Sequence, residues 1–333
     1  RDQPDRKNRI TFARRKKQKW CHLDARYSSY KASVTKHTQM KIAVDFPSVA
    51  YREGHKKVLE LAEAIEAIGF DEIAAFDHVV MGYPSETRTT IYPAEMPVLE
   101  ALMLLANLAA VTTTISLSTE VLVLPQRQPV LVAKQLSTLD TLSNGRVRLG
   151  IGVGWQDSEY DALEEDFHTR GKRMDEAIDL LRAYWAGGQI SFQGDFYQSN
   201  DMGMEPVSPQ GINLPIWIGG VGKAAVRRTA QKGDGWMASG VSDEQALTTV
   251  ADIREQAEQF GRNPSEIGTQ LMLQPPPRRK EDKFFYADLD QVSERAAIVN
   301  AMNFDWISIN ATAAVSYTHL RAHETREDRV SPH

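Results

Sequence analysis

Cysteine is almost absent from this sequence, with a single residue, Cys21, among 333. One thiol cannot form an intramolecular disulfide, and it cannot supply the cysteine clusters of zinc or iron–sulfur sites. Long apolar runs are absent too, since none approaches the roughly 18 residues that a membrane-spanning helix needs. No segment combines the basic start, apolar middle and small-residue cleavage site of a secretory signal, so we expect a cytoplasmic protein without a membrane partner.

The net charge of −5 is unevenly distributed along the chain. Residues 1–39 hold twelve Lys or Arg and three Asp or Glu, so a local charge of +9 precedes a body of −14. A basic arm of this kind can bind nucleic acid or an anionic membrane. Its lack of periodicity and its low apolar content are more typical of a disordered leader, so we expect it to lie outside the fold and to have no nucleic-acid partner.

Between residues 40 and 312, short β-branched runs alternate with longer stretches of helical period. We predict strands at 41–46, 71–80, 115–125, 147–155, 215–220, 235–239, 268–274 and 305–310. We predict helices at 55–69, 97–112, 129–145, 157–165, 171–186, 222–232, 243–260 and 288–302. Eight strands with interleaved helices predict an α/β fold, a (β/α)8 TIM barrel, with an open doubly wound sheet as the alternative.

Two further segments depart from this alternation. Residues 187–214 are rich in Gly, Gln, Asn and Pro, which indicates an insertion after an internal strand, such as a small hairpin. Residues 313–333 lack periodicity and hold three of the eight histidines, but no ordered partner for a metal site is in view. This tail looks non-native, and we expect the final helix of the barrel to be missing. On helix 171–186, Arg173 and Glu176 read as a surface ion pair.

In such a barrel, functional residues lie at the carboxyl ends of the strands, which singles out Asp77 and His78. His78 is either a satisfied rim histidine or a proton donor positioned by the neighbouring acid. Gly150, Gly152 and Gly154 fail the G-x-G-x-x-G spacing of dinucleotide sites. We expect them to leave room for a flat ligand across the mouth.

Three other features near predicted strand ends each allow two interpretations. Trp155 could stack on a ring system or pack in the core. Gly219 and Gly220 precede a helix, where free amides fit a phosphate, or else they form a tight turn with positive φ. Glu120 is a lone charge in an apolar strand, so either its side chain faces the mouth or its backbone is irregular.

Several motifs together resemble the luciferase-like monooxygenase family, in particular its branch that uses the deazaflavin coenzyme F420. The resemblance covers residues 40–312. The motifs are "DHVV", "VLVLPQRQPVLVAKQLSTLDTLSNGRVRLGIGVGW", "FYQ" before "PVSPQ", "PIWIGG" and "GDGWM".

The resemblance implies roles for residues in three places. Asp77 would hydrogen-bond the cofactor ring, and His78 would act as proton donor or electrostatic stabiliser, with Trp155 as a second catalytic candidate. The family's bulge, often a cis peptide, would fall at Glu120–Val121, where the backbone rather than the carboxylate would be used. The remaining cofactor contacts implied by the resemblance are Thr119, Ser158, Gly219, Gly220 and Val221.

The implied reaction is hydride exchange between coenzyme F420 and a small organic substrate. With reduced FMN in place of the deazaflavin, the implied reaction is a monooxygenation that uses O2. Two alternatives of another class are a non-catalytic flavin-binding barrel and a barrel hydrolase or lyase that holds a phosphorylated ligand. Relatives of this kind are often dimers, so a homodimer is a further expectation.

Overall fold

The computed structural model describes residues 40–86, 90–274 and 285–312. The predictions for the basic leader, for the tail and for the missing final helix concern residues 1–39 and 313–333, which lie outside the described residues. Within the described chain, the main sheet has nine strands. These are β1 (Lys41–Asp45), β2 (Glu72–Ala75), β3 (Ser116–Thr119), β4 (Leu122–Val123), β5 (Val147–Gly152), β8 (Ile216–Gly219), β9 (Gly235–Ala238), β10 (Gly268–Met272) and β11 (Trp306–Asn310).

The sheet closes on itself. Its order is β3-β2-β1-β11-β10-β9-β8-β5-β4, and β3 also pairs with β5. Each of these pairings is parallel, and β3 and β4 are two parts of one interrupted strand, so eight positions form the ring. The predicted (β/α)8 barrel is therefore confirmed, and the open doubly wound sheet is excluded.

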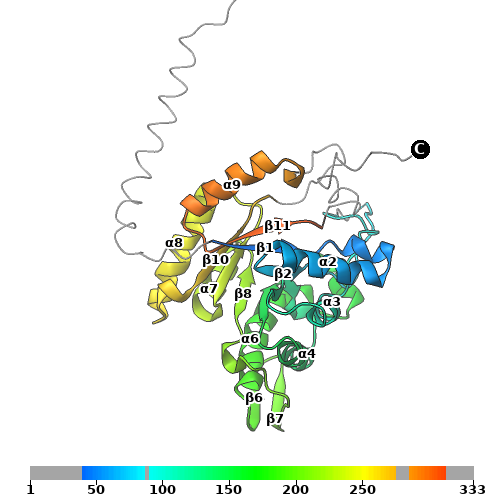
Figure 1. The fold of residues 1–333 in the computed structure, drawn as a ribbon. Helices are drawn as coiled ribbons and strands as arrows, with labels where there is room; N and C mark the ends of the chain where they lie inside the picture. The colour runs from blue at the N-terminus through cyan, green and yellow to red at the C-terminus, as the bar shows by residue number, and fades with distance from the viewer. Residues whose placement is uncertain (1–39, 87–89, 275–284, 313–333) are drawn as a thin grey trace, which may run out of the picture. The chain divides into compact units, whose positions relative to one another are not determined.

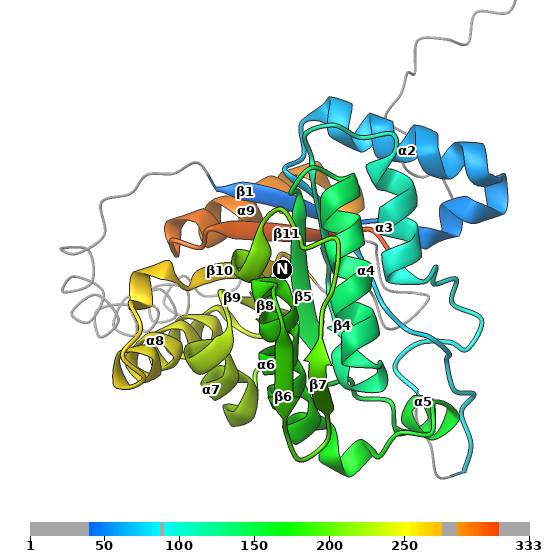
Figure 2. The ribbon, with the colours of Figure 1, turned by 90° about the horizontal axis from the view of Figure 1, so that it is seen from below.

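Helices cover the outside of the barrel (Figures 1 and 2). They are α2 (His55–Ile68), α3 (Ala101–Ala109), α4 (Pro129–Leu142), α5 (Asp157–Ala162), α6 (Arg170–Ala186), α7 (Lys223–Lys232), α8 (Asp243–Gln259) and α9 (Leu289–Ala301). In α2 the buried residues Val58, Leu61, Ala62 and Ile65 recur every three or four positions, and Gly69 ends the helix with φ 97°. Among the described residues, no helix has both the length and the apolar character needed to cross a bilayer.

The insertion predicted at 187–214 contains an antiparallel hairpin, β6 (Ile190–Gln193) and β7 (Gln198–Met202), which projects away from the barrel (Figure 1). Glu176 of α6 stabilises the turn of this hairpin, because its carboxylate accepts hydrogen bonds from the amides of residues 195–197. The predicted surface pair of Arg173 with Glu176 is wrong. Arg173 is buried and forms an ion pair with Glu165 instead.

The amino-terminal half of the barrel interior is filled by a buried cation. The Arg148 guanidinium stacks between Trp217 and Trp306, at 4.2 and 4.5 Å from their ring centroids, and forms an ion pair with Glu72. A Cβ added to Gly235 would lie 2.3 Å from the Trp217 ring, so glycine is needed there for close packing. This plug closes one end of the barrel and leaves the carboxyl end as the place for a site.

Candidate functional site

Asp77 and His78 lie in the loop that follows β2 rather than within a strand. The predicted strand at 71–80 is shorter than expected, because β2 ends at Ala75. The later apolar residues belong to the rim, where Val79 and Val80 are 41% and 44% exposed. Since the strands of the ring are parallel, this loop opens at the same edge as the loops after β5 and β8.

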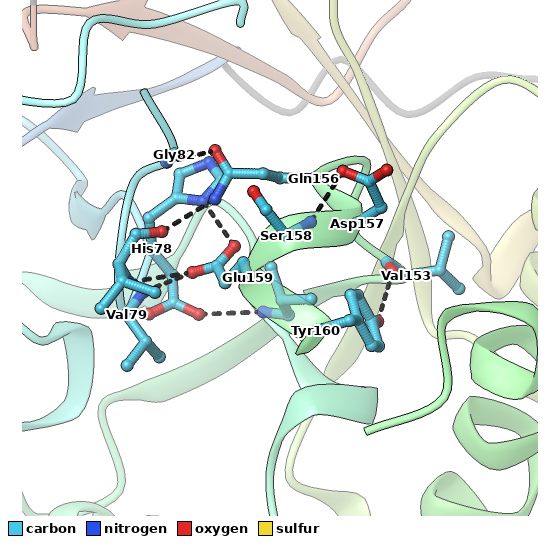
Figure 3. A network of polar contacts seen from close by, with 12 residues as sticks. His78, Val79, Gly82, Val153, Gln156, Asp157, Ser158, Glu159 and Tyr160 are labelled. Carbon is cyan, nitrogen blue, oxygen red and sulfur yellow. Dashed lines mark hydrogen bonds and ion pairs between the residues drawn. The ribbon is translucent and has the colours of Figure 1, made fainter. Parts of the chain in front are cut away.

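The His78 ring is fixed by a carboxylate from α5 (Figure 3). Its Nδ1 lies 2.8 Å from Oε2 of Glu159, and Oε1 of Glu159 accepts hydrogen bonds from the amides of Val79 at 2.6 Å and Val80 at 3.2 Å. Burial tends to raise the pKa of the Glu159 carboxyl, but the hydrogen bond and charge of His78 outweigh it and hold that pKa below its usual value. Glu159 is thus an ionised acceptor that keeps a proton on Nδ1.

Gln156 binds the same loop through two hydrogen bonds. Its Oε1 accepts a hydrogen bond from the Gly82 amide at 3.2 Å, and its Nε2 donates to the Val80 carbonyl at 2.9 Å. Neither Gln156 nor Glu159 was identified from the sequence. Their position just after the strand that ends in alternating glycines is the signal that could have identified them.

Aromatic rings surround His78 on the side of the mouth. Its ring centroid lies 5.6 Å from that of Trp155, 6.2 Å from that of Tyr92 and 5.2 Å from that of Phe76. The two catalytic candidates, His78 and Trp155, are therefore brought together from the loops after β2 and β5. Tyr92 and Phe76 complete a wall that the sequence did not reveal, because Tyr92 comes from a loop without periodicity.

Asp77 points away from its neighbour His78. It is 2% exposed, its Oδ2 accepts a hydrogen bond from the Val123 amide at 3.0 Å, and its Oδ1 accepts one from Arg127 at 2.6 Å. Burial raises the pKa of the Asp77 carboxyl, with Arg127 opposing the rise. The acid that positions His78 is therefore Glu159 and not Asp77. Both Asp77 oxygens are directed to protein groups rather than toward a ring at the mouth.

The third strand of the barrel is interrupted where the resemblance placed a bulge. The peptide between Glu120 and Val121 is cis. A Cβ added to Gly152 or Gly219 would lie 2.7 or 2.9 Å from the Val121 side chain. Thr119 Oγ1 donates to the Gly150 carbonyl at 2.6 Å. Gly152 and Gly219 thus make room for this bulge, and the expected room for a flat ligand across the mouth stays a prediction.

The backbone at Glu120 is irregular, as one of the two interpretations of this lone charge predicted, and its side chain is buried in the barrel interior rather than exposed at the mouth. It is 8% exposed and accepts hydrogen bonds from Gln270 Nε2 at 2.8 Å and Ser308 Oγ at 2.6 Å. Burial raises the pKa of the Glu120 carboxyl to about 7, against the hydrogen bond from Ser308. The Glu120 carboxylate is thus engaged by protein groups in the interior, and use of its backbone by a ligand stays a prediction.

The turn after β8 has the positive φ that the tight-turn interpretation of Gly219 and Gly220 predicted, while a phosphate contact there stays a prediction. β8 ends at Gly219, Gly220 has φ 113°, and α7 begins three residues later at Lys223. Val221 is 51% exposed on this turn. A cavity of about 320 Å³ lies beside it, lined by Val221, Val241, Glu244, Gln245, Thr248 and Thr249.

Ser158, the remaining candidate, stands at the start of α5, between Asp157 and Glu159. Its Oγ is buried without a hydrogen-bond partner among the described residues, while its amide donates to Asp157 Oδ1 at 2.7 Å. An unsatisfied hydroxyl beside the His78–Glu159 contact is suited to bind a ligand atom. No set of three or more His, Cys, Asp or Glu side chains in the described part of the chain is arranged to hold a metal ion.

Comparisons with known proteins agree on one family. A family model described as luciferase-like monooxygenase matches residues 37–315. An uncharacterized protein of Mycobacterium tuberculosis is 35% identical over 217 residues, which make up 63% of this chain and 74% of that protein. The FMNH2-dependent dimethylsulfone monooxygenase of Pseudomonas fluorescens is 32% identical over 201 residues, 60% of this chain but only 52% of that enzyme.

The barrel is also similar to solved structures. The coenzyme F420-dependent tetrahydromethanopterin reductase of Methanopyrus kandleri matches with a TM-score of 0.65 and 15% identity, covering 86% of this chain and 99% of that one. At this level of identity the likeness concerns the fold alone.

Proposed function

Because the chain belongs to the luciferase-like monooxygenase family, we propose that its barrel mouth binds coenzyme F420 and that the enzyme transfers a hydride between this deazaflavin and a small organic substrate. The contact between His78 and Glu159 carries the proposal. It places an imidazole with a fixed tautomer among aromatic rings at the mouth, and such an imidazole can transfer a proton to or from a ligand.

The residues at the mouth fit a planar ring. Val121 forms a small apolar surface on the bulge between β5 and β8, and the wall of Trp155 and Tyr92 stands by His78. These two sides belong to one rim, because Asp77 binds the Val123 amide just beyond the bulge. A ring lying on Val121 would have one edge near His78. We assign Asp77 to holding the loop in place and not to the ring itself.

The start of α7 fits an anionic tail. No side chain caps this helix, and Gly220 and Gly222 leave the backbone amides accessible to a phosphate. The turn lies next to Val121 through Gly219, so a molecule with its ring on the bulge would reach the helix with its tail. Gly219, Gly220 and Val221 therefore remain the proposed contacts of this end.

When bound, the cofactor would supply the hydride chemistry, and the protein would supply orientation and a proton. Since Glu159 keeps a proton on Nδ1 of His78, Nε2 is the atom that can accept or donate a proton at the mouth. The aromatic wall would exclude water from that side. Ser158 Oγ would hold a polar atom of the substrate or of the ring.

A second candidate is an FMN-dependent monooxygenation that uses O2. It is favoured by the 32% identity to a monooxygenase named for FMNH2, although this chain spans only about half of that enzyme. Titration of the purified protein with F420 and with FMN, followed by tryptophan fluorescence, distinguishes the two. We expect tighter binding of F420. FMN binding without F420 binding would overturn the preference for F420. Binding of neither would favour the alternative of a barrel that acts on another phosphorylated ligand.

A further inference from the structure

Asp45 is a buried acid without a visible partner. It ends β1 inside the barrel and is 0% exposed, and neither carboxylate oxygen has a hydrogen-bond partner among the described residues. Buried polar groups in folded proteins are almost always paired, so an orphaned carboxyl requires an explanation. A bound proton is the simplest one, because it removes the charge and turns one oxygen into a donor.

Glu120 is the acceptor that such a donor would meet. Asp45 pairs with Ala74 of β2, and the Glu120 amide donates to the carbonyl of the next residue, Ala75, at 2.9 Å. The two acids thus lie on either side of β2, and a side-chain interaction with Glu120 is among the causes that raise the pKa of Asp45. The charge of Glu120 acts on Asp45, and so does that of Glu72 below.

The charges inside the barrel do not balance when every group is ionised. Among the described residues, Asp45, Glu72 and Glu120 are three carboxyls of the interior, and Arg148 is the cation that faces them. Arg148 is already held by Glu72. Tyr286, near both Asp45 and Glu120, adds no charge at neutral pH, because burial raises its pKa to about 12. Two uncompensated buried negative charges are costly, which favours retention of a proton.

The hydrogen bonds indicate which acid keeps that proton. Glu120 accepts from Ser308 and Gln270, and Gln270 is oriented for this because its Oε1 accepts from Arg148 at 2.6 Å. Two donors stabilise the ionised form of Glu120, whereas Asp45 has none. Burial and the charge of Glu120 raise the pKa of Asp45 well above its usual value. The proton therefore belongs on Asp45.

We propose that Asp45 and Glu120 form a proton-binding carboxyl pair beneath the mouth, in which protonated Asp45 donates to the Glu120 carboxylate, and that loss of protons from this pair weakens binding of an anionic ring cofactor above it. The second half rests on the proposed function. The pair is connected to the bulge through the backbone, because Val121 of the bulge directly follows Glu120. Added negative charge under the bulge would repel an anionic ligand.

Infrared spectroscopy of the ligand-free protein tests the pair itself. At pH about 8, where ordinary carboxyls are ionised and Glu120, with a pKa of about 7, is mostly ionised too, we expect a carbonyl band from protonated Asp45. Asp45→Asn should remove this band, and Glu120→Gln should retain it. Asp140→Asn is the matched control, because Asp140 is buried and accepts four hydrogen bonds outside the barrel interior. No band in the wild type, or one that survives Asp45→Asn, would overturn the pair.

Binding of F420 as a function of pH, or of FMN where F420 does not bind, tests the coupling. We expect the affinity of the wild type to fall about tenfold between pH 6 and 8, as Glu120 ionises below the mouth. Glu120→Gln should remove most of this fall, and Asp140→Asn should retain it. An equal fall in Glu120→Gln would refute the coupling. Absence of FMN and F420 binding at every pH would instead refute the proposed function, while the infrared result would still decide whether the pair exists.

Discussion

The Nδ1 atom of His78 lies 2.8 Å from Oε2 of Glu159, a residue 81 positions further along the chain. This contact joins the loop after β2 to α5, and it fixes both the position and the tautomer of the imidazole. The same carboxylate holds two amides of the His78 loop. One side chain thus combines a structural task with a chemical one, so its replacement should affect stability and activity together.

Glu159→Gln should lower the free energy of unfolding by about 1–3 kcal/mol, because an amide cannot accept all the hydrogen bonds that the buried carboxylate accepts. The pKa of Glu159 is lower in the folded protein than in the unfolded chain. The carboxylate therefore adds to the free energy of unfolding above its pKa in the unfolded chain, and this stabilisation is lost as pH falls through its pKa in the folded protein. Thermal unfolding at neutral and acid pH measures both effects, and the variant should lose less stability on acidification. Asp157→Asn, at the start of the same helix, is the control. Equal stability of Glu159→Gln and wild type would contradict the contact.

His78→Ala should reduce turnover by at least about 100-fold while the cofactor affinity stays within about tenfold. The reason is that the imidazole stands at the edge of the mouth, whereas the bulge and the turn before α7 would provide most of the binding surface. Stopped-flow kinetics and cofactor titration separate the two quantities. His168→Ala replaces an exposed histidine and should leave both unchanged. Unchanged turnover in His78→Ala would remove His78 from the chemistry.

The fold could be predicted because strand and helix periodicity are local properties of the sequence. The eight strand positions follow from such patterns, and the insertion with its hairpin follows from the local composition of residues 187–214. The end of β2 could not be placed, because Phe76, Val79 and Val80 continue an apolar run whose last members serve the rim. Apolar character alone does not distinguish a strand from an aromatic wall.

The partners within the site could not be predicted for a different reason. Asp77 and His78 are adjacent in the sequence, but their side chains bind different elements, Arg127 on one side and Glu159 on the other. Adjacent residues in an extended segment point to opposite sides, so neighbours in sequence seldom share a task. Of the charges inside the barrel, Glu120 stood out as a lone charge in an apolar strand, but its partners and the pair of Arg148 with Glu72 could not be predicted, because only closure of the ring brings these side chains together.

Gly220→Ala should lower the free energy of unfolding by about 1–3 kcal/mol and weaken binding of a phosphate-bearing cofactor, because φ 113° is unfavourable for any residue with a Cβ. Gly222→Ala is a matched control two positions away. Gly222 has φ −74° and nothing within 4 Å of an added Cβ, so its replacement should be close to neutral for stability. Chemical denaturation and FMN titration of both variants provide the comparison. If both variants bound FMN as the wild type does, the proposed location of the anionic tail would be wrong.

The stability of the protein should fall as pH rises through neutrality. The pKa of Glu120 is about 7 in the folded protein and 4.5 ordinarily, so its contribution is present below the unfolded pKa and is lost as pH rises through the folded one. A shift of this size corresponds to at most about 3 kcal/mol. Asp45 adds a further loss at higher pH, so Asp45→Asn should become progressively more stable than the wild type above neutrality. Melting temperatures measured from acid to alkaline pH test this, with Asp140→Asn expected to lose stability by a similar amount at every pH. A wild-type curve that stays flat from pH 5 to 9 would mean that neither acid holds a proton in the folded barrel.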